Sequence, residues 1–212
     1  MQEKTEKRLL TVEKFIDKYG EKEFTKIVNS FDCLGEKRKN NVEVCKKLNK
    51  FLTDKSLSYA RNNFSETYLF IQNHVGKCDF ELIAYCAIQA GQQRVVKNFK
   101  TQIRHLDDEL NDFFKKDKDI INVEFYPDIE IPYFAVNGDY QGQGYGVAFM
   151  FLIFKKVYKI AQDIGCPILV ISEPADTAFE FYKSLSFIPC ETSNPRSGNL
   201  AIPTKELLNL IE

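Results

Sequence analysis

The chain has 212 residues, of which 44% are hydrophobic and 28% are charged. This composition is globular and long enough to bury a core, so it excludes disordered, collagen-like and low-complexity chains as well as miniproteins held by disulfides or metals. The 29 lysines and arginines nearly balance the 30 acidic residues, so bulk charge does not indicate a polybasic nucleic-acid-binding protein.

The first third of the sequence predicts helices. Apolar residues at approximately helical spacing, ended by Gly20, indicate a first helix: Leu9, Leu10, Phe15 and Ile16. A second helix is expected over residues 24–28 and a third over residues 44–60, with a charged loop at residues 36–41 between them. Residues 1–28 are therefore predicted to form a helical extension.

From residue 67 the pattern changes to β. Residues 67–71 and 80–88 predict two strands joined by a turn at Gly76 and Lys77. Residues 95–118 are polar and are expected to be an insertion. Residues 129–136 predict a strand in which Pro132 implies a bulge or a missing ladder bond.

The remaining third predicts alternating helices and strands. Residues 147–164 form the strongest helical pattern, apolar on most faces and closed by Gly165. The other expected elements are a buried strand, a short helix and two strand pieces: 167–171, 175–184, 187–188 and 199–202. Because no repeat or linker divides the chain, we expect one α+β domain over residues 1–212.

Targeting and metal signals are missing from the sequence. The charged N-terminus is unlike a signal peptide, and the longest apolar run, residues 147–154, is far shorter than the ~20 residues of a membrane span. The six cysteines form no C-x-x-C pair, and two histidines provide no zinc-ligand spacing. We therefore expect a soluble cytoplasmic protein with reduced thiols, no metal and no membrane partner.

Four of the ten glycines cluster directly after the strand predicted at residues 129–136: Gly138, Gly142, Gly144 and Gly146. Glycine permits tight turns and leaves neighbouring N–H groups unobstructed. With a helix dipole behind them, such N–H groups bind anions, and pyrophosphate is a natural ligand. We expect Gly138 to make the turn and the other three to expose the donors.

Known glycine loops of other kinds fit this segment poorly. A Walker A loop requires Lys and Ser/Thr after its last glycine, but Gly146 is followed by Val147 and Ala148. A dinucleotide-binding loop has G-x-G-x-x-G and an acidic end to the next strand, whereas this loop has G-x-G-x-G and the next strand ends in Ser172. A kinase would need H-R-D and D-F-G. A plain turn does not require three glycines in five residues.

Two motifs resemble the GNAT N-acetyltransferase superfamily. Residues 141–146 (Gln-Gly-Gln-Gly-Tyr-Gly) resemble its Q-x-x-G-x-G acetyl-CoA loop, and residues 178–187 resemble its A-x-x-F-Y-x-x-x-G-F block. Ser186 stands where that block has glycine, which a serine can replace with some strain if φ is positive. The resemblance implies an α+β fold with α/β/α layers: a GNAT-like mixed, mostly antiparallel central sheet with helices on both faces.

The resemblance also implies the ligand and its binding residues. Acetyl-CoA would be the co-substrate, with no metal. The strand residues that would hold its pantetheine arm and polarise the thioester are Phe134, Ala135 and Val136. The loop residues that would hold its pyrophosphate through backbone N–H groups are Gln141, Gly142, Gln143, Gly144, Tyr145 and Gly146.

Two catalytic residues follow from the same resemblance. Tyr182 matches the tyrosine that protonates the departing thiolate, although the same helix face would also suit a core tyrosine. Glu130 is a candidate general base acting through water. Whether Glu130 faces the cleft depends on the bulge near Pro132.

The layout from residue 31 to residue 203 resembles the GNAT branch that includes the toxins of bacterial toxin–antitoxin pairs. We expect an N-acetyltransferase that moves an acetyl group to a primary amine by direct attack in a ternary complex. The alternatives are a toxin that acetylates aminoacyl-tRNA, with an antitoxin as partner, and a non-catalytic acyl-CoA-binding module. Basic residues concentrate before residue 118, which is compatible with RNA without requiring it. A homodimer is also compatible with the sequence.

Overall fold

The computed structural model describes residues 5–34, 42–74, 79–94, 125–190 and 198–211. The predicted charged loop at 36–41, the turn at Gly76 and Lys77 and the insertion at 95–118 lie outside these ranges. Within the described ranges, no helix combines the length and apolarity needed to cross a membrane.

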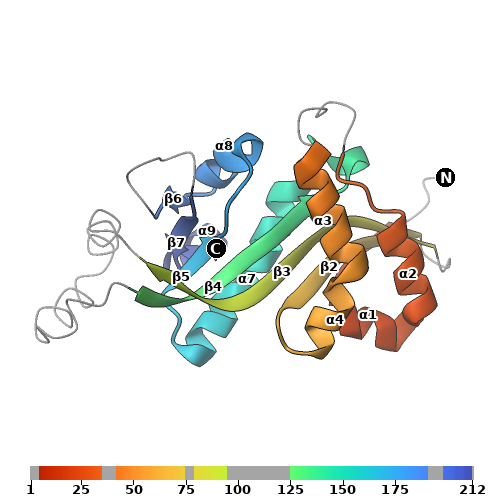
Figure 1. The fold of residues 1–212 in the computed structure, drawn as a ribbon, viewed down its shortest axis with the longest axis horizontal. Helices are drawn as coiled ribbons and strands as arrows, with labels where there is room; N and C mark the ends of the chain where they lie inside the picture. The colour runs from red at the N-terminus through yellow and green to blue at the C-terminus, as the bar shows by residue number, and fades with distance from the viewer. Residues whose placement is uncertain (1–4, 35–41, 75–78, 95–124, 191–197, 212) are drawn as a thin grey trace, which may run out of the picture. The chain divides into compact units, whose positions relative to one another are not determined.

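Within the described residues, seven strands form one sheet in the order β1-β2-β3-β4-β5-β7-β6 (Figure 1). Their bounds are β1 Thr5–Thr11, β2 Glu66–His74, β3 Phe80–Arg94, β4 Phe125–Val136, β5 Ile168–Ile171, β6 Ile188–Pro189 and β7 Leu200–Pro203. The pairs β1·β2, β2·β3, β5·β7 and β6·β7 are antiparallel. The expected α+β fold with a mostly antiparallel sheet is confirmed.

The chain forms two compact units. The first, here called the loop unit, comprises Met1–Gln89 and Ile131–Phe154, and the second, here called the C-terminal unit, comprises Ala90–Glu130 and Lys155–Glu212. Strands β3 and β4 and helix α7 each contribute residues to both units. The single-domain description therefore remains a prediction.

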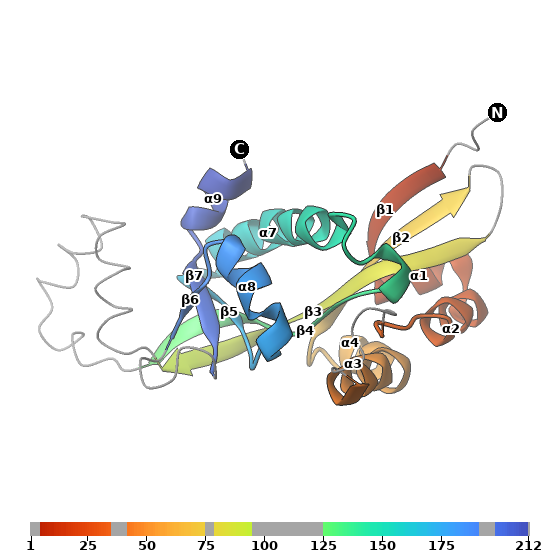
Figure 2. The ribbon, with the colours of Figure 1, turned by 90° about the horizontal axis from the view of Figure 1, so that it is seen from above.

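Four helices cover one face of the sheet in the loop unit: α1 Val12–Tyr19, α2 Glu21–Asn29, α3 Val42–Asp54 and α4 Ser56–Arg61 (Figure 2). Thr11 caps α1 by accepting a hydrogen bond from the Lys14 N–H, and Gly20 ends it with a φ of +90°. The helices bury Phe15, Ile27 and Leu52 completely against the sheet. The predicted second helix and the end of the first at Gly20 are confirmed.

The N-terminal prediction is wrong for Leu9 and Leu10. Both belong to strand β1, where Leu9 is paired with Phe70 and Leu10 with Leu69 of β2. Local spacing suggested a helix, but pairing with a strand some sixty residues away determines the conformation. The helix predicted over residues 44–60 also breaks at Lys55, which separates α3 from α4.

The first half of α7, Tyr145–Ile164, covers the opposite face of the sheet in the loop unit (Figure 2). Phe149 of this helix stacks on Phe70 of β2 and Phe134 of β4, with ring centroids 5.6 and 5.4 Å apart. Tyr133 and Ala135, on the alternate face of β4, belong instead to the core under α1–α4. Strand alternation thus divides β4 between two cores.

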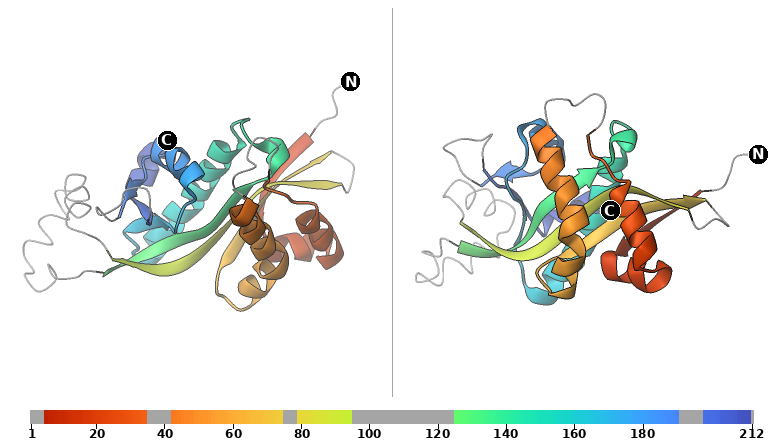
Figure 3. Two further views of the ribbon diagram at one scale, coloured as in Figure 1. Left: turned by 45° about the horizontal axis from the view of Figure 1, so that its top comes forward. Right: turned by 45° about the vertical axis from the view of Figure 1, so that its right-hand side comes forward.

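The C-terminal unit contains β5, β6 and β7 with helices α8 Asp176–Ser184 and α9 Glu206–Ile211 (Figure 3). Ile168, Val170, Cys190 and Ala201 form its buried sheet core. The predicted helix α8 and buried strand β5 are confirmed, and α7 ends where expected, at Gly165 with a φ of +71°. Helix α9 had no counterpart in the sequence prediction.

Candidate active site

The glycine loop begins where β4 ends, and hydrogen bonds hold its start against β3. The N–H of Asn137 donates to the carbonyl of Ile83 at 2.8 Å, and its side-chain amide donates to the carbonyl of Leu82 at 3.3 Å. The Asn137 side-chain oxygen also accepts from the Asp139 N–H, which caps the 3₁₀ turn Gly138–Tyr140. The loop therefore starts from a fixed position on the sheet.

Gly142 and Gly144 have the backbone conformation that favours glycine. Their φ angles are +74° and +83°, whereas Gly138 and Gly146 are not among the positive-φ glycines of the described chain. A Cβ at Gly142 or Gly144 would meet no atom within 4 Å. Backbone conformation rather than crowding selects glycine at these two positions, and open space remains beside the loop.

Helix α7 starts directly behind these glycines, at Tyr145. The Ala148 N–H donates to the Gly144 carbonyl at 3.0 Å. The N–H groups of the three preceding residues, Tyr145, Gly146 and Val147, belong to the first helical turn and have no acceptor within the helix. Together with the dipole of a 20-residue helix, they provide the donors that an anion requires.

The side chain of Gln141 positions the loop. Its Nε2 donates to the carbonyl of Cys33 at 2.8 Å and to that of Val136 at 2.9 Å. Its backbone N–H donates to the Gly138 carbonyl at 3.3 Å. Gln143 similarly donates from Nε2 to the Asp139 carbonyl at 2.7 Å, so both glutamine side chains hold the loop in shape.

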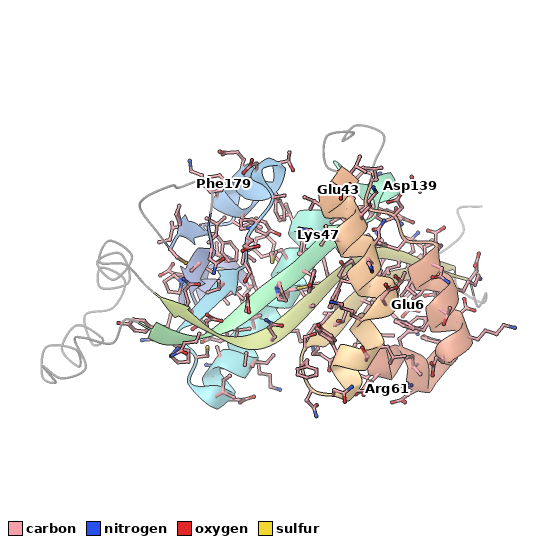
Figure 4. All side chains as sticks on the ribbon, viewed as in Figure 1. Glu6, Glu43, Lys47, Arg61, Asp139 and Phe179 are labelled. Carbon is pink, nitrogen blue, oxygen red and sulfur yellow. The ribbon has the colours of Figure 1, made fainter. Side chains whose placement is uncertain are left out.

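The segment between α2 and α3 forms a platform under the loop, which sequence reasoning missed. The Asp32 carbonyl accepts from the Gly138 N–H at 2.8 Å. The Asp32 carboxylate accepts from the Leu34 N–H and from Asn49 Nδ2, both at 2.9 Å. The Asn49 side-chain oxygen accepts from the Cys33 N–H at 3.3 Å. Figure 4 marks Asp139 in the loop and Glu43 and Lys47 on α3, the helix that carries Asn49.

Aromatic side chains and one lysine flank the loop. Lys7 of β1 donates to the Tyr145 hydroxyl at 3.1 Å and lies 4.6 Å from the centre of its ring. The rings of Tyr140 and Tyr145 meet edge to face with centroids 5.3 Å apart. Tyr140 donates to the carboxylate of Glu81, and burial together with this carboxylate raises the pKa of Tyr140. Lys7 therefore places a positive charge close to the start of α7.

The strand residues predicted to hold the pantetheine arm lie in the loop unit. Ala135 is buried, Phe134 is half-buried and stacks on α7, and the Val136 carbonyl accepts from Gln141. Their contact with acetyl-CoA remains a prediction, as does that of the loop residues.

Tyr182 lies near the end of α8 in the C-terminal unit and is only 5% exposed. Its ring meets those of Phe181 and Phe187 edge to face, with centroids 5.1 and 5.9 Å apart. The Phe187 N–H donates to the Tyr182 carbonyl at 3.2 Å, and the Ser186 N–H donates to the Lys183 carbonyl at 3.1 Å. These two bonds form a Schellman motif, which fixes the end of the helix and with it the backbone of Tyr182.

Ser186 occupies the left-handed position of this motif, with a φ of +68°. Sequence analysis required a positive φ for a serine to stand where the resembled block has glycine, and the structure confirms this positive φ.

Glu130 of β4 is half-buried and belongs to the C-terminal unit. It accepts a hydrogen bond from the Ser172 hydroxyl at the end of β5. Asp128 lies two residues earlier on the same face of the strand and is 4% exposed. Burial, reinforced by the charge of Glu130, raises the pKa of Asp128 to about 7. Sequence reasoning missed Asp128, because no local pattern reveals a buried charge.

The predicted site residues are thus distributed over both units. The strand and loop residues from Phe134 to Gly146 belong to the loop unit, whereas Tyr182 and Glu130 belong to the C-terminal unit. In the part of the chain that the structure describes, no group of three or more His, Cys, Asp or Glu side chains could hold a metal ion.

Comparison with known proteins identifies relatives by fold. No protein-family profile and no curated protein matches the chain. A single-residue variant of KacT, 19% identical, superposes with a TM-score of 0.70 over 96% of this chain and 98% of that chain. An AtaT variant toxin bound to acetyl-CoA and the C-terminus of the antitoxin AtaR is 19% identical, with a TM-score of 0.62 over 97% of both chains.

A third structure, AtaT complexed with acetyl-methionyl-tRNAfMet, is 20% identical with a TM-score of 0.67, covering 99% of this chain and 100% of that chain. The three structures show that this chain has the fold of KacT and AtaT. The GNAT-like fold implied by the two sequence motifs is confirmed.

Proposed function

We propose that this protein is an N-acetyltransferase that moves the acetyl group of acetyl-CoA to a primary amine by direct attack in a ternary complex. The observation that carries the proposal is the glycine loop at the start of α7. Two positive-φ glycines and the N–H groups of the first helical turn, which have no acceptor within the helix, suit an anion in a fold shared with an AtaT structure that contains acetyl-CoA.

Within this proposal, backbone N–H groups of residues 142–146 hold the pyrophosphate. Gln141 contributes its side chain to the shape of the loop rather than to the ligand. The strand residues Phe134–Val136 hold the pantetheine arm, and a neutral amine attacks the thioester carbonyl carbon. The new C–N bond forms as the C–S bond breaks, and the CoA thiolate takes a proton from Tyr182.

Tyr182→Phe tests the proposal. Phenylalanine keeps the buried ring contacts but removes the proton donor. We expect the Kd of acetyl-CoA to be unchanged while kcat falls about 100-fold, because a general acid contributes at least this much. The measurement is CoA release from acetyl-CoA in the presence of a panel of primary amines, together with calorimetric binding of acetyl-CoA.

Two other results would contradict parts of this proposal. Unchanged kcat in Tyr182→Phe would make Tyr182 a core residue only. Binding of acetyl-CoA by the wild type without CoA release for any amine would favour a non-catalytic acyl-CoA-binding module.

The second candidate for the acceptor is an aminoacyl-tRNA. Its support is the similarity to AtaT, whose structure holds acetyl-methionyl-tRNAfMet. Helix α3 also presents three exposed lysines, Lys46, Lys47 and Lys50, which suit a phosphate backbone. On this proposal the protein is a cytoplasmic toxin with an antitoxin partner, as AtaT has AtaR. A homodimer also remains a proposal.

Expression of the chain alone tests this candidate. We expect growth arrest and an N-acetylated amino acid on charged tRNA, both relieved in Tyr182→Phe. Acetylation of small amines without modification of Met-tRNA would reject the tRNA acceptor and leave the acetyltransferase proposal intact.

A further inference from the structure

Two cysteines face each other in the core of the loop unit. Cys33, in the platform segment between α2 and α3, is 4% exposed, and Cys45, near the start of α3, is 7% exposed. The Cys45 thiol donates to the Cys33 carbonyl at 3.4 Å, and the Cys33 thiol donates to the Cys45 carbonyl at 3.7 Å. Each side chain therefore points towards the backbone of the other residue, which is the orientation that a disulfide requires.

The bonding of this pair differs from that of two other free thiols in the described chain. Cys86 donates to the carbonyl of the next residue, and Cys166 donates to a carbonyl two residues further along the chain. Such local bonds are what a cysteine makes when it serves as a small buried hydrophobic residue. Cys33 and Cys45 instead bond to each other in both directions, although they are 12 residues apart.

The Cys33 carbonyl connects the cysteine pair with the glycine loop. It accepts from two donors, the Cys45 thiol and Nε2 of Gln141, the second at 2.8 Å. The Cys33 N–H donates to the side-chain oxygen of Asn49, which lies one helical turn after Cys45 on α3. A change in the bonding of the two sulfur atoms therefore acts on the carbonyl that anchors Gln141.

The two thiols are not equally ready to react. Burial, together with a hydrogen bond to the Cys45 thiol, raises the pKa of the Cys33 thiol. A thiol reacts with oxidants as its thiolate, so Cys33 is disfavoured as the first residue to react. The first reaction is therefore expected at Cys45, with Cys33 as the residue that resolves it.

We propose that Cys33 and Cys45 are a redox modification site, at which a peroxide forms a reversible disulfide that ties the platform to α3. This bond does not depend on the proposed acetyltransferase function. Its effect on acetyl-CoA does rest on that function. The disulfide replaces two hydrogen bonds with weak thiol donors by a covalent bond, and a more restricted platform should hold the loop in a more ordered state.

The oxidation is balanced by hydrogen peroxide. The Cys45 thiolate attacks one peroxide oxygen, the O–O bond breaks, and the products are the Cys45 sulfenic acid and hydroxide, which takes up a proton to become water. The Cys33 sulfur then attacks the Cys45 sulfur. The S–O bond breaks, and the hydroxyl group leaves as water with the proton of Cys33. Two thiols and one peroxide thus give one disulfide and two waters, and a dithiol reductant reverses the change.

The test is mass spectrometry of the folded wild type after hydrogen peroxide, with free thiols alkylated before digestion. We expect a fragment pair that joins Cys33 to Cys45 and disappears after dithiothreitol. Cys33→Ser should stop at the Cys45 sulfenic acid, which dimedone labels, whereas Cys45→Ser should give no label at Cys33. Cys166→Ser is the matched control and should form the same disulfide as the wild type.

Two further measurements follow the effect of the bond. The disulfide restricts the unfolded chain, so oxidation should raise the Tm of the wild type by about 5 °C and leave that of Cys45→Ser unchanged. The Kd of acetyl-CoA, measured by calorimetry, should be about threefold lower for the oxidised wild type than for the reduced one. In Cys45→Ser the hydroxyl can still donate to the Cys33 carbonyl, and peroxide should not change its Kd.

The outcomes separate this inference from the proposed function. Two unmodified thiols in peroxide-treated wild type, or oxidation of either cysteine without the joined fragments, would overturn the disulfide. A joined pair with an unchanged or higher Kd would overturn its link to the loop. Absence of acetyl-CoA binding in both redox states would contradict the proposed function and leave the disulfide standing. The wild type alone gives the fragment map, so a serine variant that does not fold leaves the test intact.

Discussion

At the scale of single residues, Ser186 shows how the fold accommodates a serine where the A-x-x-F-Y-x-x-x-G-F block has glycine. The backbone at this position bonds as a Schellman motif, with Phe187 packed against Tyr182, and a residue with a side chain stands at a φ of +68°. A left-handed conformation costs an L-residue roughly 1–2 kcal/mol relative to glycine, part of which is offset by the greater freedom of glycine in the unfolded chain.

Ser186→Gly should therefore stabilise the protein. We expect the free energy of unfolding to rise by about 0.5–1 kcal/mol, measured by urea titration. Ser184→Gly is the matched control: it makes the same chemical change two residues earlier, inside α8, and should lower stability. A loss of stability in Ser186→Gly would mean that the serine hydroxyl has a role that outweighs the backbone strain.

At the scale of elements, the glycine loop depends on the segment between α2 and α3. Gly138 and Gln141 bond to the carbonyls of Asp32 and Cys33, and Asn49 of α3 bonds to both of these residues. The loop is thus held from a part of the chain about a hundred residues away. The affinity for acetyl-CoA that we propose for the loop should depend on this platform, because an ordered loop loses less entropy on binding.

Asn49→Ala tests this dependence. It removes two hydrogen bonds, each worth roughly 0.5–1.5 kcal/mol, so we expect about a tenfold increase in the Kd of acetyl-CoA. At saturating acetyl-CoA, kcat should be nearly unchanged. Asn62→Ala is the control, since Asn62 bonds to Ser58 in α4 and not to the platform. An equal effect of both variants on the Kd, measured by calorimetry, would indicate general destabilisation instead.

At the scale of the whole molecule, Asp128 makes stability depend on pH. Its pKa is about 7 in the folded protein and close to 3.8 when exposed, so the folded state binds the proton more tightly. The contribution of protonated Asp128 is fully present below about pH 4 and is lost as the pH rises through about 7. At 1.36 kcal/mol per unit, the loss is at most about 4 kcal/mol.

Asp128→Asn should therefore flatten this part of the stability profile. Urea titrations between pH 4 and pH 8 should show wild-type stability falling relative to the variant, with the variant the more stable at pH 8. A constant difference across this range would indicate that Asp128 stays ionised throughout.

Much of the fold could be predicted where the signal is local. Glycine at position 165, continuous apolar residues in β5 and the face of α8 identify elements from neighbours in the sequence. Strand β1 could not be predicted, because Leu9 and Leu10 have no local β pattern and become a strand only by pairing with β2. The candidate site divides in the same way: its glycines and Tyr182 are visible in the sequence, whereas Asp32, Asn49 and Asp128 are not.

The sequence alone therefore indicated a glycine loop in front of a buried helix, and with it the resemblance to acetyl-CoA-dependent transferases. Gly142 and Gly144 indicate the loop because glycine readily adopts a positive φ, and the apolar pattern of α7 indicates the buried helix. Only the tertiary structure decided which residues hold the loop in place and that the Asp128 carboxylate is buried. Both depend on contacts between segments that are far apart in the sequence: the hydrogen bonds from the loop to distant carbonyls, and the packing of Asp128 against Gly91. Neighbouring residues in the sequence do not reveal such contacts.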